Sequence, residues 1–408
     1  MRKLDIAVIG YGTAGQAAAL LLAADGHRVQ VFERAPALGP VGAGFLLQPT
    51  GLQVLWELGL LASALRHGRI VRRLYGETPC GRAVMDMRYA DLSAALYGLG
   101  MQRGALFSLL AGALPATVPV HCGKRIVDID SKAGRITDEN GARHGSFDLV
   151  VAADGAASLS RVRTGGMRRD TPYPWGALWC LLPQADWPWP DELRQRYVAA
   201  RKMIGLLPVG TRPGDDTPRL SFFWSLPASD FDAWRQQGLP AWLQEIESLW
   251  PQARPLLRDV DDGALLARAQ YRDTVMHPWH RDRLVLIGDA AHAMSPQLGQ
   301  GVNMALMDAL ALRDALRAET AIAGALARYQ RGRAAHVRIY QFWSRWLTPL
   351  FQSDCDAIAM LRDLGLLPLG RLPGGRGHTW PHAAGAQRYP AWPVRAPAAG
   401  SGFPARTG

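Results

Sequence analysis

The chain has 408 residues, of which 48% are hydrophobic and 20% are charged, a balance that is typical of a globular protein and excludes a disordered or fibrous one. The formal net charge is +11, but it comes almost entirely from arginines that are scattered along the chain rather than clustered. We therefore attribute the charge to composition and predict no nucleic-acid partner, while a positive surface can still attract an anionic substrate.

The cysteines and the apolar runs narrow the class further. Cys80, Cys122, Cys180 and Cys355 lie far apart and form no C-x-x-C pair, so they indicate neither a metal site nor a redox dithiol. No apolar run approaches the ~20 residues that are needed to span a bilayer. We expect a monomer or homodimer without metal or integral membrane segments, located in a reducing cytoplasm.

The first segment of the chain predicts a βαβ unit. Residues 6–9 form a short apolar run of strand length, residues 16–24 form a helical stretch rich in Ala and Leu, and residues 29–32 form a second strand. The turn between the first strand and the helix has the pattern G-x-G-x-x-G, with the sequence Gly10-Tyr11-Gly12-Thr13-Ala14-Gly15. A parallel α/β sheet is expected to follow from this unit.

This glycine-rich turn indicates a dinucleotide site. Its backbone N–H groups and the positive end of the helix dipole can receive a pyrophosphate, and Gly12 leaves room for the phosphate to approach. Glu33 closes the second strand, where its carboxylate can accept hydrogen bonds from an adenosine ribose and would repel a 2′-phosphate. The site therefore favours FAD or NAD over NADP, and the alternative is a tight turn without a ligand.

A second strand and turn lie at residues 147–161. The apolar run 147–153 leads into Asp154-Gly155-Ala156-Ala157-Ser158-Leu159-Ser160-Arg161. Taken alone, this segment is interpreted as an aspartate that caps a helix, with Ser158 and Arg161 three residues apart on one helical face.

The middle of the chain has a different composition. Residues 170–275 are rich in Trp and Pro and contain strand-like runs at 178–182, 204–208 and 220–226. We infer a β-rich domain that is inserted into a discontinuous nucleotide-binding domain formed by residues 1–169 and 276–373.

A third strand and turn follow this insertion. The apolar run 284–287 precedes Gly288-Asp289-Ala290-Ala291-His292, and the chain continues through Pro296 to Gly299-Gln300-Gly301-Val302-Asn303. Asp289 stands at the carboxyl end of a strand, where it can accept hydrogen bonds from sugar-alcohol hydroxyls. A helix predicted over 302–333 would direct its positive end toward a flat ring that the glycines allow to approach. The alternative is an ordinary turn at the end of a strand.

Residues 374–408 contain many Pro, Gly, Ala and Arg residues without sustained periodicity, so we predict a tail rather than a domain.

The three motifs, in this order and at these separations, resemble those of the class A flavoprotein monooxygenases, the para-hydroxybenzoate hydroxylase-like family, over residues 4–345. A softer resemblance over 347–373 is to the ubiquinone-biosynthesis hydroxylase branch, and nothing is recognised after Gly374. The resemblance implies an α/β fold with a discontinuous Rossmann-type FAD-binding domain, an inserted β-rich substrate domain and C-terminal helices.

The resemblance also implies which residues contact FAD. In the family, the first motif holds the ADP half, the D-G-x-x-S-x-x-R motif serves FAD and NAD(P)H, and the G-D motif binds the ribityl chain. Arg103 matches the short R-x-x-L element of the family, and Arg34 is similar to the residue that follows the ribose-binding acid. The implied cofactor-binding residues are Gly10, Gly12, Thr13, Ala14, Gly15, Glu33, Arg34, Arg103, Asp154, Arg161, Asp289, Pro296, Gly299, Gly301, Val302 and Asn303.

The implied activity is that of a monooxygenase in which NAD(P)H reduces FAD. Oxygen then adds at flavin C4a, and the hydroperoxide transfers one oxygen atom to a small or medium-sized unsaturated substrate, with an aromatic ring as the favoured class. We expect the substrate between residues 296–301 and the inserted sheet, and no catalytic acid or base is identified. The candidates for the substrate wall are Gln48, Leu206, Phe222 and Trp224, with ordinary core packing as the alternative.

Three other functions stay open. Trp187-Pro188-Trp189-Pro190 is similar to the W-x-W element of flavin-dependent halogenases, but the Ile-Pro that follows it in that family is missing. A flavin reductase or desaturase, and a flavin-binding scaffold without turnover, are the others. The aromatic segment 341–347 predicts a helix that docks on the nucleotide-binding domain, with a peripheral membrane contact as the alternative.

Overall fold

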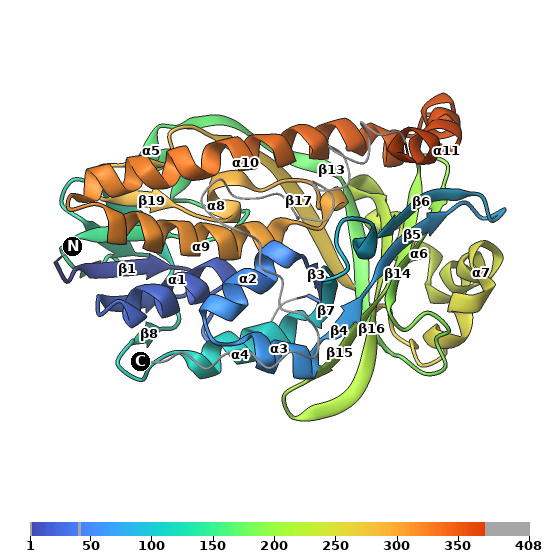
Figure 1. The fold of residues 1–408 in the computed structure, drawn as a ribbon, viewed down its shortest axis with the longest axis horizontal. Coiled ribbons are helices and arrows are strands. Elements are labelled where there is room, and N and C mark those ends of the chain that lie inside the picture. Colours follow the sequence, from blue (N-terminus) through green and yellow to red (C-terminus); the bar gives the residue numbers. More distant parts are fainter. Residues whose placement is uncertain (1, 40–41, 372–408) are drawn as a thin grey trace.

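The computed structural model describes residues 2–39 and 42–371 (Figure 1). The predicted tail at 374–408 therefore lies outside the described residues. One end of the molecule is built on a parallel sheet covered by helices, the other end on a long antiparallel sheet, and helix α10 (Ile322–Phe351) runs along both.

The parallel part is a six-stranded sheet in the order β18-β19-β12-β1-β2-β8. Its strands pair in parallel except at the edge, where β18 and β19 are antiparallel. Residues 149–152 are buried without exception, which agrees with the apolar runs of the sequence because such strands are covered on both faces. The bounds are β1 Asp5–Ile9, β2 Arg28–Phe32, β8 Val120–His121, β12 Leu149–Ala152, β18 His280–Arg281 and β19 Leu284–Leu286.

Helices cover this sheet and bring its glycine-rich turns together. Helix α1 (Thr13–Ala24) is nearly all small or apolar, and it packs against both α4 (Arg103–Ala113) and α9 (Gly301–Ala318). Because α9 begins directly after the third motif, this packing joins segments that are almost 300 residues apart in sequence. The predicted βαβ unit at the N-terminus is confirmed.

The second large sheet has seven strands in the order β17-β13-β16-β15-β14-β5-β6 and is antiparallel except between β14 and β5. The predicted segment 170–275 supplies most of it, but two strands come from residues 73–88, ahead of the predicted boundary. The bounds are β5 Arg73–Glu77, β6 Ala83–Arg88, β13 Met167–Pro183, β14 Glu192–Val198, β15 Lys202–Arg212, β16 Asp215–Pro227 and β17 Ala267–Met276.

Two small sheets and several short helices complete the described chain. The sheet β3-β7-β4 connects the two large sheets, since β7 and β3 both contact β15. Its strands are Gly44–Leu47 (β3), Arg69–Val71 (β4) and Gly98–Gln102 (β7), and the other sheet comprises Ile126–Asp130 (β9), Arg135–Asp138 (β10) and Arg143–His144 (β11). The helices are α2 Pro49–Glu57, α3 Leu61–His67, α5 Arg161–Thr164, α6 Phe231–Gln237, α7 Leu239–Leu249, α8 Asp289–His292 and α11 Asp356–Arg371, with 3-10 turns at 89–91, 228–230, 251–257, 263–265 and 296–298.

The C-terminal helices differ from the prediction in one respect. The helix predicted over 302–333 is two helices, because the chain turns between α9 and α10 and both Glu319 and Ala321 are extended. An apolar period of 3.6 continues across such a break, so the sequence pattern alone did not reveal it.

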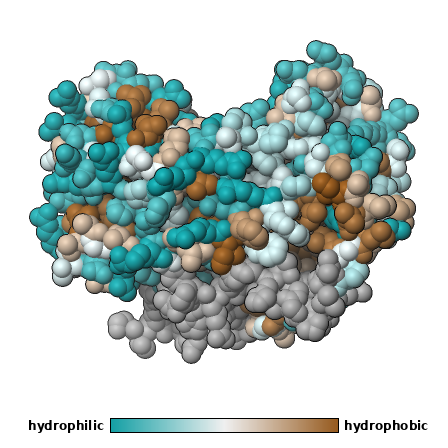
Figure 2. All heavy atoms as spheres, turned by 90° about the horizontal axis from the view of Figure 1, so that it is seen from above, coloured by the Kyte–Doolittle hydropathy of each residue, from teal (hydrophilic) through white to brown (hydrophobic). Residues whose placement is uncertain are grey.

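Helix α10 docks through one face. Gln341 and Ser344 are buried, whereas Phe342 and Trp346 are 59% and 54% exposed. Figure 2 shows the side above α10 as mostly hydrophilic, with hydrophobic residues gathered toward the end where Figure 1 places α11. Among the described residues, no helix is long and apolar enough to cross a membrane.

Candidate cofactor site

The first glycine-rich turn joins β1 to α1 in a conformation that needs glycine. Gly10 has φ of +100°, a region that residues with a side chain rarely adopt. A Cβ atom at Gly15 would lie 2.0 Å from the carbonyl oxygen of Gly10, so this glycine lets the helix pack against the strand. A Cβ atom at Gly12 would meet nothing within 4 Å. Gly12 caps α1 without help from a side chain, so the end of the helix is open to an anion.

Glu33 stands beside this turn at the end of β2. One carboxylate oxygen accepts the backbone N–H of Tyr11 at 2.7 Å, and the other accepts the backbone N–H of Ala35 at 2.8 Å. Each oxygen keeps a free lone pair for a further donor. The carboxylate is thus fixed in place and can bind a ribose hydroxyl.

A cavity of about 650 Å³ opens in front of the turn, and most of the residues that the first motif predicted line it. The side chains of Arg34, Arg103, Lys124 and Arg125 bring positive charge to it, against Glu33 and Asp154. Arg103 lies 5.8 Å from the ring centre of Phe45, which also lines the cavity. The predicted residues among its lining are Gly10, Gly12, Thr13, Glu33, Arg34, Arg103 and Asp154.

Asp154 organises the second turn from inside. Its Oδ2 atom accepts the backbone N–H groups of Leu159 and Ser160, at 3.1 and 3.2 Å, and the Ser160 hydroxyl at 2.9 Å. The expected capping role is corrected: α5 begins at Arg161 after Ser160 and has no side-chain cap, the N–H groups bound by Asp154 precede the helix, and Ser158 lies outside it. Its Oδ1 atom is buried and has no partner among the described residues, so the same carboxylate keeps an acceptor on the wall of the cavity.

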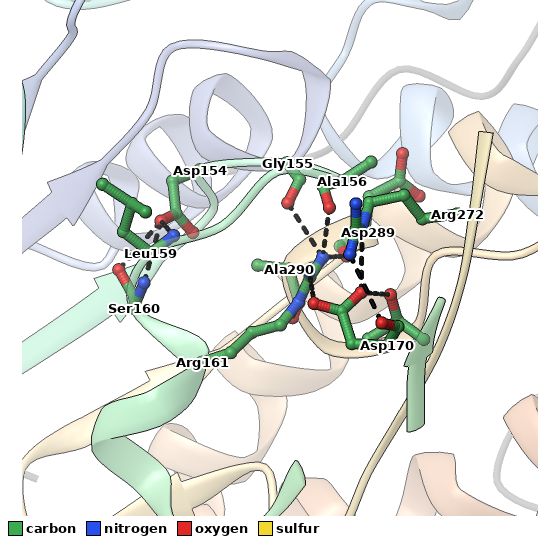
Figure 3. Close-up of polar contacts among 11 residues, drawn as sticks. Asp154, Gly155, Ala156, Leu159, Ser160, Arg161, Asp170, Arg272, Asp289 and Ala290 are labelled. Carbon is green, nitrogen blue, oxygen red and sulfur yellow. Dashed lines mark hydrogen bonds and ion pairs between the residues drawn. The ribbon is translucent and has the colours of Figure 1, made fainter. Parts of the chain in front are cut away.

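Arg161 has a different position from the one expected of a cofactor contact (Figure 3). The residue is 1% exposed and its guanidinium group donates to backbone carbonyls of two turns. It bonds Gly155 and Ala156 in the second turn, at 3.2 and 2.7 Å, and Asp289 and Ala290 in the third turn, both at 2.8 Å. Because these contacts consume its donors, we correct the expectation: Arg161 clamps the two turns together rather than lining the cavity.

The clamp continues into the seven-stranded sheet through Asp170. This carboxylate accepts Arg161 at 3.1 Å, Arg272 at 2.8 Å and the Thr274 hydroxyl at 3.1 Å. Burial opposes ionisation of Asp170, but the hydrogen bond from Arg272 and the charge of Arg161 outweigh it and hold the pKa of Asp170 below its ordinary value. The two sheets are thus joined by ionised side chains directly behind the turns.

The third turn is held by a buried ionic cluster. Gly288 has φ of +59° and donates its N–H to Oδ2 of Asp308 at 2.8 Å. The same carboxylate binds Nε2 of His292 at 2.6 Å and Nε of Arg333 at 2.7 Å. Burial disfavours the charge on Asp308, but His292 and Arg333 lower its pKa well below the ordinary range. His292 is thereby a packed residue in this cluster.

Asp289 itself points outward. Its side chain is exposed, and within the described residues its carboxylate makes no hydrogen bond. Gly288 lies against α1, since a Cβ atom there would be 3.1 Å from Cβ of Ala14. The third turn therefore borders the same helix end as the first turn, with the carboxylate of Asp289 free to bind a hydroxyl.

The loop after this turn is tied to β3 by Asn303. Its Oδ1 atom accepts the N–H of Gln48 at 2.8 Å, and its Nδ2 atom donates to the carbonyls of Leu46 and Gly299 at 3.2 and 3.4 Å. Asn303 is fully buried, so its side chain shapes the loop and leaves backbone groups of the loop to a ligand. Pro296, Gly299, Gly301 and Val302 belong to this loop and the start of α9, and they are not among the residues that line the cavity described above.

The predicted substrate wall needs correction. Leu206, Phe222 and Trp224 belong to a core cluster on the far face of the seven-stranded sheet, and the rings of Phe222 and Trp224 both lie 5.9 Å from Trp242 of α7. The alternation of side chains along a strand turns all three away from the loop 296–301. Gln48 does lie beside that loop, but it is 1% exposed and its side chain accepts the Tyr89 hydroxyl.

The cavity fits FAD on three observations. The space at Gly12 is open where a pyrophosphate would approach, Glu33 and Asp154 keep free acceptors for hydroxyls, and four cationic side chains are among the residues that line the cavity. No group of three or more His, Cys, Asp or Glu side chains in residues 2–39 and 42–371 could hold a metal.

Comparison with known proteins agrees with this fit. A family model described as FAD binding domain matches residues 3–341. The chain belongs to this family, that of the class A FAD-dependent monooxygenases. Kynurenine 3-monooxygenase of Salinispora arenicola is 30% identical over 83% of this chain and 78% of its own.

Other relatives extend the comparison. The 6-hydroxynicotinate 3-monooxygenase of Bordetella bronchiseptica is 27% identical over 76% of this chain and 82% of its own. The crystal structure of Klebsiella pneumoniae HpxO with FAD and uric acid superposes with a TM-score of 0.77 at 22% identity, covering 93% of this chain and 96% of that one. The predicted α/β monooxygenase fold and the FAD cofactor are confirmed.

Three groups of this monooxygenase escaped the sequence analysis. They are the clamp partners Asp170 and Arg272, the cluster partners Asp308 and Arg333, and the face of the seven-stranded sheet that lies toward β3. Asp308 lies 16 residues after His292 in the sequence. No local pattern marks its pairing with Arg333, which lies on another helix. Only the packing of α9 against α10 brings these charges together.

The rival halogenase element has an ordinary structural role. Trp187 is 5% exposed and packs against Trp189 and Trp250 in the core on the far face of the sheet.

Proposed function

We propose that this FAD-dependent monooxygenase uses NADH or NADPH and O₂ to hydroxylate a small or medium-sized aromatic or heteroaromatic compound. The observation that carries the proposal is the convergence of three turns, one after β1, one after β12 and one after β19, on the end of helix α1. A bound FAD would supply the redox chemistry that activates O₂.

The residues of this chain have separate tasks in the proposal. The open end of α1 binds the pyrophosphate, Glu33 binds the ribose, and Arg103 adds positive charge beside the phosphates. Asp289 binds the ribityl hydroxyls, since its carboxylate is exposed and without a protein partner in the described chain. With FAD bound, the positive end of α9 would stabilise negative charge on the flavin.

The names of the relatives support the substrate class. The relatives compared above are named for hydroxylation of kynurenine and of 6-hydroxynicotinate, and others act on urate or on 3-amino-4-hydroxybenzoate. All four compounds contain a planar conjugated ring. We infer that this enzyme acts on the same chemical class, while their diversity leaves the individual compound open.

The test is anaerobic stopped-flow reduction of the purified flavoprotein by NADH and by NADPH, with and without a panel of phenols, aminobenzoates, hydroxypyridines and quinolones. We expect one nucleotide to reduce the flavin, and the correct ring compound to accelerate that reduction. Incorporation of one atom of ¹⁸O₂ into the product then distinguishes hydroxylation from hydride transfer by a reductase or desaturase. Reduction by neither nucleotide under any condition would leave a flavin-binding scaffold.

A further inference from the structure

The two faces of the seven-stranded sheet carry different aromatic residues. On β16, the even positions 220, 222, 224 and 226 pack into the core beneath α6 and α7. The odd positions face the other way, because the Ser221 hydroxyl accepts the backbone N–H of Gly44 on β3 at 3.1 Å. Phe223 therefore lies on the side of the cofactor, two residues along the same face as Ser221.

Three aromatic side chains meet on this side. Trp179 of β13 is the cross-strand partner of Phe223, and their ring centres are 5.1 Å apart with an angle of 34° between the planes. The indole Nε1 of Trp179 donates to the hydroxyl oxygen of Tyr271 on β17 at 3.1 Å. All three side chains are partly exposed, whereas Phe222 and Trp224 on the other face are buried. Trp179 and Phe223 are partly exposed on inner strands of the sheet, and Tyr271 lies beside them on the edge strand β17, which indicates a surface that a ligand can cover.

The loop after the third turn closes one end of this surface. Tyr173, on the same strand as Trp179, donates to Thr348 and Gln352 of the C-terminal segment at 3.0 and 3.1 Å. Gln297 of the loop donates to the same oxygen of Gln352 at 2.5 Å. These contacts hold residues 296–298 against the sheet near the three aromatic side chains.

The hydrogen bond between Trp179 and the Tyr271 hydroxyl has a fixed direction. An indole N–H can only donate, so the phenol oxygen is the acceptor in this pair and its own proton is directed elsewhere. Burial raises the pKa of Tyr271, and the hydrogen bond from Trp179 and the charge of Arg103 offset only part of that rise, so the phenol keeps its proton at neutral pH. A ligand that lies on this surface can therefore accept a hydrogen bond from the Tyr271 hydroxyl, while the neighbouring side chains contribute only aromatic contacts.

We propose that Trp179, Phe223 and Tyr271 bind the ring of the substrate, and that this ring carries a hydroxyl, oxo or carboxylate oxygen which accepts the Tyr271 O–H. The inference rests on the proposed function and adds the chemistry by which the substrate is chosen. A flat ring can stack against Trp179 and Phe223, and the hydrogen bond from Tyr271 to its oxygen substituent sets the orientation of the ring. Tyr271 is thus a specificity-determining residue.

The test uses the FAD-loaded enzyme and ring pairs that differ in one oxygen substituent: phenol and benzoate against benzene, and 4-hydroxyquinoline against quinoline. Binding is measured by the change in flavin absorbance and by calorimetry, independent of turnover. We expect the wild type to prefer the oxygen-bearing rings by about tenfold or more, the value of a hydrogen bond in a buried site. Tyr271→Phe should keep the flavin and lose that preference.

A matched pair of variants separates the two faces. Phe223→Leu and Phe222→Leu make the same change at adjacent residues, and only the first should weaken binding of every ring in the panel. This pair also carries the test if Tyr271→Phe fails to hold its flavin. Equal effects of the two variants, an unchanged preference in Tyr271→Phe, or no ring binding to the wild type at millimolar concentration would each overturn the inference. Reduction by a nicotinamide nucleotide and ¹⁸O incorporation report separately on the proposed function.

Discussion

The six-stranded sheet carries its candidate cofactor-binding groups on the turns that follow parallel strands, whereas the seven-stranded sheet carries the proposed substrate-binding groups on one face of mostly antiparallel strands. In the first, backbone N–H groups and a few carboxylates do the binding, because glycine-rich turns place the main chain itself at the ligand. In the second, the backbone is consumed by pairing with neighbouring strands, so only alternate side chains can face a ligand. The first sheet therefore suits a cofactor common to a family, and the second suits a substrate that changes from member to member.

The clamp around Arg161 and Asp170 is where the two sheets meet (Figure 3). One guanidinium group holds both turns of the first sheet, and one carboxylate connects it to β13 and β17 of the second. The proposed substrate surface is thus held against the cofactor site by ion pairs in which Arg161 is buried and Asp170 and Arg272 are partly exposed. The predictions below test this division, from the largest expected effect to the smallest.

Trp224→Ala should cause the largest loss of stability. Its ring is 2% exposed and packs on Trp242, so its removal leaves a cavity and should cost about 3–5 kcal/mol of unfolding free energy. Phe223→Ala, on the partly exposed face, should cost less. Urea denaturation of both variants measures the difference, and a larger loss for Phe223→Ala would reverse the assignment of the faces.

Gly12→Leu should remove the cofactor while leaving the chain folded. A Cβ atom at this position meets no protein atom within 4 Å and points into the expected approach of the pyrophosphate, so we expect FAD affinity to fall by about 100-fold or more, which is about 2.7 kcal/mol. The flavin-to-protein ratio and far-UV circular dichroism measure the two effects. Gly112→Ala, at an exposed helical glycine with equally open surroundings, is the control, and full flavin retention by Gly12→Leu would exclude this pyrophosphate site.

Asp170→Asn should loosen the junction and change the response to acid. Replacing a carboxylate that pairs with two arginines should cost about 1–3 kcal/mol at neutral pH. Because the pKa of Asp170 is lowered in the folded state, its contribution is present above about pH 4, the ordinary value for aspartate, and is lost as the pH falls below it. Thermal unfolding between pH 3 and 7 should therefore show a shallower acid dependence in the variant. Asp261→Asn, at an exposed site, should behave as wild type, and equal profiles for all three proteins would refute the junction.

Asp289→Ala should have the smallest effect on the fold and a selective effect on the cofactor. Its exposed carboxylate makes no protein hydrogen bond within the described residues, so the melting temperature of the apoprotein should hardly change. FAD affinity should fall by about tenfold, or about 1.4 kcal/mol. Titration of the apoprotein with FAD measures this, and an unchanged FAD affinity together with a raised substrate KM would contradict the role given to Asp289.

The sequence by itself determined the parallel α/β part of this protein. The glycine turn after β1, Glu33 at the end of β2 and the third turn after β19 are local patterns, because strand, turn and helix are adjacent in the chain and each constrains the next. The local glycine turn left FAD or NAD open, and the resemblance of the three motifs to the class A flavoprotein monooxygenases implied the family and FAD. Local patterns failed where one continues across a break, as at Glu319 between α9 and α10.

Only the tertiary structure decided which groups meet across the chain. Alternation at residues 220–226 predicted two faces of a strand, but the packing of α7 and β3 decided that Phe222 and Trp224 are core and Phe223 is not. The pairing of Asp308 with Arg333, and of Arg161 with Asp170, likewise joins elements that no sequence period relates. Buried charges and aromatic walls depend on distant partners, and that is why their roles could not be derived from neighbouring residues alone.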